Sequence, residues 1–179
     1  MSNTIVVYKS RYGSTKKYAE WISKTLGAEL SEASNVNAEA LKQYDIIIYG
    51  GGLYASGILG INLITKNFEQ LKNKRLIVFT VGLADPKNEE QFKPLLDKNF
   101  NDEMKDTIKV FHLRGAIDYK NLGFIHKSMM AMLKSKVEKT AIEDRDDESN
   151  MMLDTYGQVV DFTDEATIKP LIEYCQEIN

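Results

Sequence analysis

Hydrophobic residues gather in short runs that recur along the chain. The runs cover residues 5–8, 28–30, 45–49, 76–81 and 108–113. A continuous apolar run of this length, with turn residues on either side, is typical of a strand that is buried on both faces of a sheet. We therefore predict a strand at each run.

Between these runs the apolar residues recur at helical spacing. This spacing predicts a first helix that begins near Ser14 or Thr15, which are placed to cap it, and ends near Leu26. Pro94 and Pro170 lie inside two later segments and should kink or shorten those helices. The later segments with helical spacing cover residues 38–41, 61–71, 89–96, 122–137 and 163–178.

The alternation of strands and helices predicts an α/β fold. The expected architecture is a doubly wound, five-stranded parallel sheet of order 2-1-3-4-5 with helices on both faces. In such sheets, ligands bind outside the carboxyl ends of the strands, where the strand order reverses. The first and third strands flank that point, so the turn at 10–15 and the loop at 50–57 are expected to face one another.

The composition favours a globular protein that does not bind nucleic acid. With 179 residues, 43% of them hydrophobic, the chain 1–179 is expected to form a single domain with a sizeable core. Its net charge of −3 lacks the basic surplus typical of nucleic-acid binding. Cys175 is the only cysteine, which fits a reducing compartment. The sequence shows neither a signal peptide nor the ~20 apolar residues of a membrane span, so a cytoplasmic protein is expected.

Residues 118–156 are an insertion that follows the fifth predicted strand. Its first half, 122–137, is predicted to be a helix flanked by lysines, and its acidic second half, 143–148, a solvated loop. The helix either packs on the domain or offers a methionine-rich face to a partner, an apolar substrate or a membrane surface. In the last case, peripheral membrane contact is expected through 122–139. The apolar stripe of this helix consists of Leu122, Ile125, Met129, Met132 and Leu133.

The turn between the first strand and the first helix collects groups that suit a phosphate. A helix N-terminus carries unpaired amides and a partial positive charge. Gly13 lets the backbone approach closely, and neighbouring hydroxyl groups are able to donate hydrogen bonds. An ordinary capped turn uses the same residue types and remains an alternative on these grounds. The residues of the turn are Ser10, Arg11, Tyr12, Gly13, Ser14 and Thr15.

Three familiar phosphate-linked sites do not match these residues. A P-loop places its glycines before Lys-Ser/Thr, whereas Gly13-Ser14-Thr15-Lys16 has the reverse order. A dinucleotide site requires G-x-G-x-x-G in the first turn, which contains only one glycine. A phosphoacceptor domain requires acidic strand ends, but Lys9-Ser10 and Gly50-Gly51 stand there. The remaining candidate ligand is a mononucleotide that has one phosphate and a flat ring lying across the other loops.

Here the chain resembles the flavodoxin family. Ser10-x-x-Gly13-Ser14-Thr15 after a first strand is similar to that family's phosphate loop for flavin mononucleotide (FMN). The resemblance implies a flavodoxin-like fold, FMN as cofactor, and a phosphate held by the turn at 10–15. Arg11 makes this loop more basic than in acidic electron-carrier flavodoxins.

The same resemblance implies that two further loops bracket the flavin ring. One is Gly51-Gly52-Leu53-Tyr54, in which Tyr54 is expected to stack on the ring. The other is Gly82-Leu83-Ala84-Asp85, which lacks the aromatic residue that many flavodoxins place there. One face of the ring is therefore expected to be open or covered by Leu83.

The C-terminal part has a narrower resemblance. Gly115-Ala116, the methionine-rich helix, Asp154-Thr155 and residues 159–164 resemble the menaquinone-dependent protoporphyrinogen dehydrogenase branch of the flavodoxin superfamily. That resemblance implies an enzyme in which FMN relays electrons from a substrate to a quinone. No residue is assigned to porphyrin binding.

Three functions follow as hypotheses. The first is an FMN-binding redox protein that transfers electrons between redox partner proteins. The second is the quinone-linked enzyme, and the third is a flavin-free α/β domain that binds partners through its methionine-rich helix. No catalytic residue and no metal site is predicted, because His112, His126 and Cys175 lack metal-ligand spacing.

Overall fold

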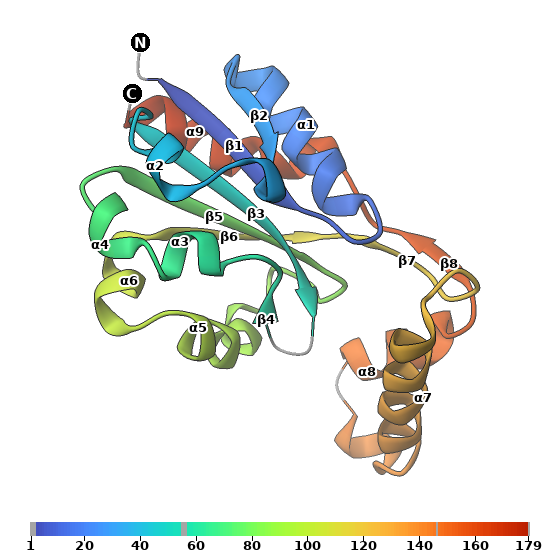
Figure 1. Ribbon diagram of the computed structural model, residues 1–179. Coiled ribbons are helices and arrows are strands. Elements are labelled where there is room, and N and C mark those ends of the chain that lie inside the picture. Colours follow the sequence, from blue (N-terminus) through green and yellow to red (C-terminus); the bar gives the residue numbers. More distant parts are fainter. Residues whose placement is uncertain (1–2, 55–56, 146, 179) are drawn as a thin grey trace.

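The computed structural model describes residues 3–54, 57–145 and 147–178, with a central sheet covered by helices on both faces (Figure 1). Five strands of the sheet run parallel in the order β2-β1-β3-β5-β6. This is the predicted 2-1-3-4-5 arrangement, because β5 and β6 are the fourth and fifth parallel strands. The bounds are β1 Thr4–Lys9, β2 Glu29–Glu32, β3 Ile46–Tyr54, β5 Arg75–Gly82 and β6 Lys109–Arg114.

The two faces of the sheet bury separate apolar clusters. On one face, α1 (Ser14–Leu26) and α9 (Lys169–Glu177) cover the strands through side chains such as Ile22 and Leu171, which are at most 1% exposed. The opposite face is covered by short helices whose buried side chains include Ile64 and Leu71. These helices are α2 Ala38–Leu41, α3 Asn62–Thr65, α4 Phe68–Leu71, α5 Lys93–Asn99 and α6 Asp102–Thr107. Burial on both faces explains why the strands are continuous apolar runs.

β3 is longer than predicted because it continues through the glycines at 50–52. Gly50 pairs with Tyr8 on one side and Phe79 on the other. A Cβ atom at Gly50 would lie only 2.1 Å from Phe79 Cζ, so glycine is required for the ring to cross the strand there. Beyond the parallel pairing, β4 (Gly57–Ile58) pairs antiparallel with the end of β3. The predicted loop at 50–57 is thus mainly strand, and its residues 55 and 56 lie outside the described residues.

The two prolines begin helices instead of kinking them. Pro94 lies in the first turn of α5, after the 3₁₀ helix η2 (Glu89–Phe92), and Pro170 lies in the first turn of α9, after η4 (Glu165–Ile168). The first turn tolerates proline because its amides have no partner within the helix. The predicted helices at 89–96 and 163–178 are therefore each divided.

The predicted helix at 61–71 is also divided, into α3 and α4. Asn67 separates them with backbone angles φ −112° and ψ 16°, outside the helical range. Its side-chain Nδ2 donates to the Leu63 carbonyl (2.9 Å). Asparagine favours breaks of this kind because its amide competes with the backbone for hydrogen bonds.

One polar contact joins β5, β6 and the neighbouring η2. His112 Nδ1 lies 2.6 Å from Thr80 Oγ1, and the imidazole stacks on the Phe92 ring with centroids 3.7 Å apart and an interplanar angle of 7°. Burial lowers the pKa of His112 to about 4. The imidazole is therefore neutral at pH 7.

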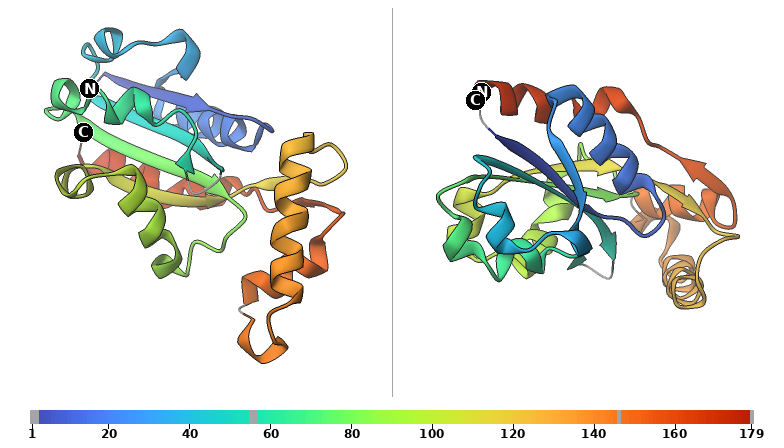
Figure 2. Two further views of the ribbon diagram at one scale, coloured as in Figure 1. Left: turned by 60° about the horizontal axis from the view of Figure 1, so that its bottom comes forward. Right: turned by 45° about the horizontal axis from the view of Figure 1, so that its top comes forward.

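The insertion projects from the end of the sheet as a separate arm (Figures 1 and 2). Its base is a two-stranded antiparallel sheet of β7 (Ala116–Asp118) and β8 (Val159–Asp161). Between these strands lie α7 (Phe124–Glu138), η3 (Ile142–Asp144) and α8 (Asp147–Thr155). The expectation of a solvated loop at 143–148 is wrong, since η3 and the start of α8 occupy it; residue 146 lies outside the described residues.

The buried face of α7 is rotated from the predicted stripe. Ile125 and Met132 are 61% and 72% exposed, whereas His126 and Val137 are 7% and 8% exposed. α7 packs along α8 instead of lying on a sheet face, so only part of its apolar surface is covered. The expectation that this helix packs on the domain holds only for its first turns, where His126 meets the turn at 10–15.

Candidate functional site

A cavity of about 640 Å³ lies at the carboxyl end of the parallel strands, between the sheet and the insertion. This is the position expected for a ligand site in a doubly wound sheet. The predicted site residues Gly13, Gly51 and Asp85 do not line it. Those that do are Ser10, Arg11, Tyr12, Ser14, Thr15, Gly52, Leu53, Tyr54, Gly82, Leu83 and Ala84.

Gly13 shapes the turn at 10–15. It adopts a left-handed conformation with φ 98° at the N-terminus of α1, which an L-residue with a side chain rarely adopts. Its N–H donates to Ser10 Oγ (3.1 Å), and its carbonyl accepts the first helical hydrogen bond from Lys17 N–H (3.0 Å). The amides of residues 14–16 therefore precede the hydrogen-bonded helix and are available to an anion.

Neither Ser14 nor Thr15 caps α1, so the capping expectation is wrong. The cap residue is Gly13, which makes no side-chain capping bond. Ser14 Oγ instead accepts a hydrogen bond from Ala116 N–H (3.0 Å), which ties the turn to the base of the insertion. Thr15 is 3% exposed and lines the cavity, and its hydroxyl makes no hydrogen bond within the described residues.

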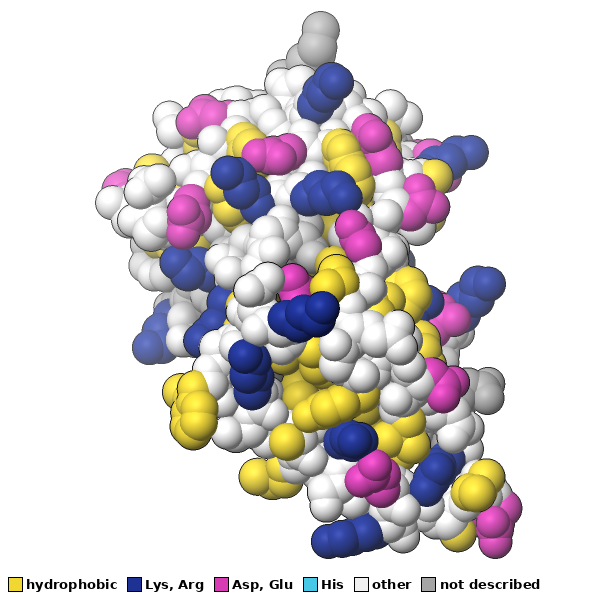
Figure 3. All heavy atoms as spheres, turned by 90° about the vertical axis from the view of Figure 1, so that its right-hand side faces the viewer, with side chains coloured by type: hydrophobic (Ala, Val, Ile, Leu, Met, Phe, Trp, Pro, Cys, Tyr) yellow, Lys and Arg dark blue, Asp and Glu magenta, His cyan; other side chains and the backbone are white. Residues whose placement is uncertain are grey.

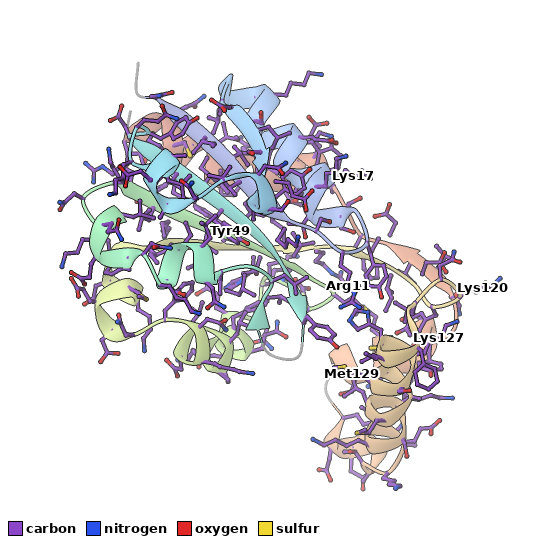
Figure 4. The ribbon with its side chains drawn as sticks, in the orientation of Figure 1. Arg11, Lys17, Tyr49, Lys120, Lys127 and Met129 are labelled. Atoms are coloured by element: carbon purple, nitrogen blue, oxygen red, sulfur yellow. The ribbon has the colours of Figure 1, made fainter. Side chains whose placement is uncertain are left out.

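Arg11 supplies positive charge at the same end of the cavity. Its guanidinium lies 6.0 Å from the Tyr12 ring centroid and 5.5 Å from the Tyr54 ring centroid. Across residues 3–54, 57–145 and 147–178, Arg11 forms no ion pair, whereas the nearby Lys17 is 3.6 Å from Asp161. Figure 4 shows Arg11 in the space between the end of the sheet and α7. The Arg11 guanidinium is therefore available to form an ion pair with an anion bound in the cavity.

The two loops predicted to flank a ring contact one another. A Cβ atom at Gly82 would lie 2.9 Å from Leu53 Cδ1, so glycine permits this close approach. A Cβ atom at Gly52 would be 3.3 Å from Thr15 Oγ1, which brings this loop to the turn at 10–15. Asp85 shapes a turn instead of lining the cavity, since its Oδ1 accepts a hydrogen bond from Lys87 N–H (3.0 Å).

His126 is one of several cavity residues that sequence analysis did not assign to the site. It reaches from α7 to the turn, where its Nδ1 is hydrogen-bonded to the Tyr12 hydroxyl. The Tyr54 ring meets it edge to face, with centroids 4.5 Å apart. Burial and the neighbouring Arg11 charge lower the pKa of His126, which favours the neutral ring. The only sequence feature that could have indicated a role for His126 was the presence of a histidine within an apolar helical pattern.

The insertion supplies an apolar wall opposite the turn. Arg114 holds the wall to the sheet: its Nε donates to the Leu83 carbonyl (3.1 Å), its Nη2 contacts Met151 Sδ (3.0 Å), and it lies 3.8 Å from the Phe162 ring centroid. The wall residues that line the cavity are Leu122, Met129, Met130, Leu133, Met151, Met152 and Phe162.

Neither a metal-ligand cluster nor a membrane-spanning helix is found in the described part of the chain. It holds no group of three or more His, Cys, Asp or Glu side chains that suits a metal ion. None of its helices has the length and apolar character needed to cross a membrane.

The fold places this chain among the doubly wound α/β proteins. The sequence model of the flavodoxin domain matches residues 5–144, and the chain belongs to that family. No curated protein matches the chain.

Similar solved structures include Flavodoxin 1 from Bacillus cereus, at 18% identity and TM-score 0.47, covering 63% of this chain and 84% of that one. Flavodoxin 2 from Bacillus cereus is 15% identical with TM-score 0.47, covering 86% and 94% of the two chains. A flavoprotein in complex with FMN from Lactobacillus acidophilus is 20% identical with TM-score 0.39, covering 64% and 93%.

Proposed function

We propose that this protein binds FMN in the cavity and transfers electrons to and from redox partners. The observation that carries the proposal is one continuous cavity that joins an anion seat to two glycine-rich strand ends. At the seat, the first amides of α1, the hydroxyl of the buried residue Thr15, and Arg11, which forms no ion pair among the described residues, suit a phosphate. At the strand ends, Gly52 and Gly82 line the same cavity, where a flat ring would lie.

In this proposal, the turn at 10–15 holds the phosphate, and Tyr54 and Leu53 lie against the ring. When bound, FMN supplies the electron-transfer chemistry, and the protein tunes it through hydrogen bonds and pocket polarity. Arg11 balances the phosphate charge. The insertion wall excludes water from the side of the site that faces α7, which strengthens the polar interactions inside.

The electron partners are redox proteins or small molecules such as a quinone. A small-molecule partner is favoured by the apolar wall, because the wall offers an uncharged molecule a surface beside the proposed flavin seat. The protoporphyrinogen dehydrogenase resemblance receives no residue-specific support, since no described cavity residue is assigned to a porphyrin. Electron transfer to a quinone is a second candidate function, and the apolar wall beside the proposed flavin seat is the observation that favours it.

The outer face of the insertion is our proposed membrane contact. Phe124 and Ile125 are 85% and 61% exposed on α7, and Ile142 is 74% exposed beyond its end. Lysines surround these side chains, and Figure 3 shows dark blue groups among the yellow ones on this side of the molecule. Apolar tips flanked by basic residues suit an anionic lipid surface.

The experiment that tests FMN binding is a visible absorption spectrum of the protein after incubation with FMN and desalting. A retained flavin spectrum at near one equivalent supports the proposal. Loss of all flavin from a protein with a folded far-UV circular dichroism spectrum contradicts it and favours the flavin-free partner-binding domain.

A further inference from the structure

The insertion leaves an unpaired hydrogen-bond donor at the cavity. His126 is 7% exposed and lines the cavity, and its Nε2 is buried without a hydrogen-bond partner among the described residues. Leaving a buried polar group unpaired destabilises the folded protein, because the group has lost its hydrogen bonds to water. An atom of this kind at a cavity wall points to a ligand that pairs with it.

The hydrogen bonds around His126 indicate which nitrogen carries the proton. The Tyr12 hydroxyl oxygen accepts from Gly123 N–H (3.3 Å), and His126 Nδ1 is the acceptor, among the described residues, to which the hydroxyl hydrogen can be donated. Nδ1 is then an acceptor, and the proton of the neutral ring is on Nε2. The unpaired atom is therefore a donor, and it requires an acceptor on the ligand.

A second buried polar atom lines the same cavity. The Tyr119 hydroxyl also lacks a hydrogen bond in the part of the chain that the structure describes. Thr155 lies beside it, but the Thr155 hydroxyl donates to the Met151 carbonyl (2.8 Å). Both unpaired atoms thus belong to the insertion and lie along its apolar wall.

The charge of the lining restricts the ligand further. Arg11, at the phosphate seat, is the single Asp, Glu, Lys or Arg among the described residues that line the cavity. The cavity side of α7 and α8 carries mainly methionine and leucine side chains, and the flexible thioethers of methionine adapt to flat apolar surfaces. On the part of this wall away from Arg11, a charged ligand would lose its hydration without gaining a counter-charge.

We propose that the insertion forms a second subsite, beside the flavin seat, for an uncharged flat ring that carries an acceptor oxygen, with His126 Nε2–H as the donor to that oxygen. This inference rests on the proposed function and deepens it, because it names the chemical class of the small-molecule redox partner. Tyr54, which touches His126, lies at the boundary between the two parts of the cavity. Figure 4 shows Met129 on the α7 side of this space.

The test compares two probes on FMN-loaded protein by isothermal titration calorimetry. The first is 2,3-dimethyl-1,4-naphthoquinone and the second is 2,3-dimethylnaphthalene, which has the same ring system without the oxygens. We expect the quinone to bind about tenfold more tightly, the range of one hydrogen bond to a buried donor. His126→Phe should remove this preference and leave the two probes with similar affinities.

A matched pair of variants tests the wall independently of His126. Met129→Lys places a charge on the cavity side of α7 and should weaken both probes at least about tenfold. Met132→Lys makes the same change on the outer side of that helix, where the side chain is 72% exposed, and should leave both affinities unchanged. If circular dichroism shows that His126→Phe does not fold, the comparison of Met129→Lys with Met132→Lys still tests whether the probes bind at the wall.

The outcomes separate the two proposals. Failure of the wild-type protein to retain FMN overturns the proposed function, and this inference falls with it. Retained FMN with no binding of either probe, or with equal binding of both, overturns the second subsite alone. A His126→Phe variant that weakens FMN and leaves the quinone preference intact also overturns it, since His126 would then act on the flavin.

Discussion

Replacing Thr15 by aspartate places a negative charge where we expect the FMN phosphate to bind. Thr15 is almost fully buried at the first turn of α1, and its hydroxyl has no other hydrogen bond in the described chain. Asparagine has the size of aspartate without its charge. The comparison of Thr15→Asp with Thr15→Asn therefore isolates the electrostatic effect from the steric one.

The expected magnitude follows from Coulomb's law. Two unit charges about 4 Å apart repel by about 4 kcal/mol at an effective dielectric constant of about 20. A phosphate monoester carries between about −1.5 and −2 charges at pH 7, which strengthens the repulsion. The introduced carboxylate can bind a proton, however, at a cost of about 1.4 kcal/mol for each of the roughly three pH units above its ordinary pKa, so the loss is limited to about the same 4 kcal/mol. At about 1.4 kcal/mol per factor of ten, Thr15→Asp should weaken FMN binding by about a thousandfold. Thr15→Asn should weaken it by about tenfold, the range of one lost hydrogen bond.

The assay is titration of the flavin-free protein with FMN, followed by flavin fluorescence. Riboflavin serves as the matched ligand because it lacks the phosphate, so Thr15→Asp should change its affinity far less. Thr25→Asp is the matched variant, since Thr25 is exposed near the other end of α1 and should leave both ligands unaffected. Equal affinities of the Thr15→Asp and Thr15→Asn variants for FMN, or an equal loss of riboflavin binding, would refute the phosphate assignment.

Three further predictions concern the ring, the fold and the outer face of the insertion. Tyr54→Ala should weaken FMN binding by about five- to tenfold, because one aromatic contact is lost. It should also shift the flavin reduction potential and leave the circular dichroism spectrum unchanged. An unchanged potential would contradict a contact between Tyr54 and the flavin ring. The pKa of His112 is lowered to about 4 in the folded state, so the unfolded chain binds more protons between pH 6.5 and 4. Stability should therefore be full above pH 6.5 and fall towards pH 4 by up to about 1.4 kcal/mol per pH unit, measured by urea unfolding; His112→Phe should reduce that slope, and an unchanged slope would assign it to other groups. Phe124→Ser with Ile125→Ser should abolish co-sedimentation with vesicles containing phosphatidylglycerol; a wild-type protein that stays in the supernatant would contradict membrane contact.

Much of the sheet was predictable because each strand is buried on both faces. Doubly covered strands must be continuously apolar, and that requirement is visible in the runs at 46–49 and 76–81. The position of the turn at 10–15 was equally predictable, since it depends only on where the first strand ends. Helix divisions at Asn67 and at the two prolines depend on local hydrogen bonds that periodicity does not register.

The insertion was harder to predict for a physical reason. Its helix α7 has apolar residues around most of its circumference, so the sequence did not specify which face α8 and the turn would cover. The orientation is set by contacts over long sequence separations, such as Tyr12 with His126 and Ala116 N–H with Ser14 Oγ. The contact of His126 with the turn at 10–15 depends on that orientation, so it could not be predicted from the sequence either.

The paired strands at the base of the insertion make it a removable module. The chain leaves and returns side by side, with Ile117 opposite Val160, and Tyr119 N–H donates to the Gln158 carbonyl (3.2 Å) just beyond the pair. Residues 120–157 are thus a loop closed at its neck. A short turn in their place would leave the pairing of the parallel sheet unchanged and would remove from the turn at 10–15 only the contacts that Tyr12 makes with Gly123 and His126. Such a neck allows the arm to be exchanged between related chains, so that recognition and redox tuning can diverge separately on one scaffold.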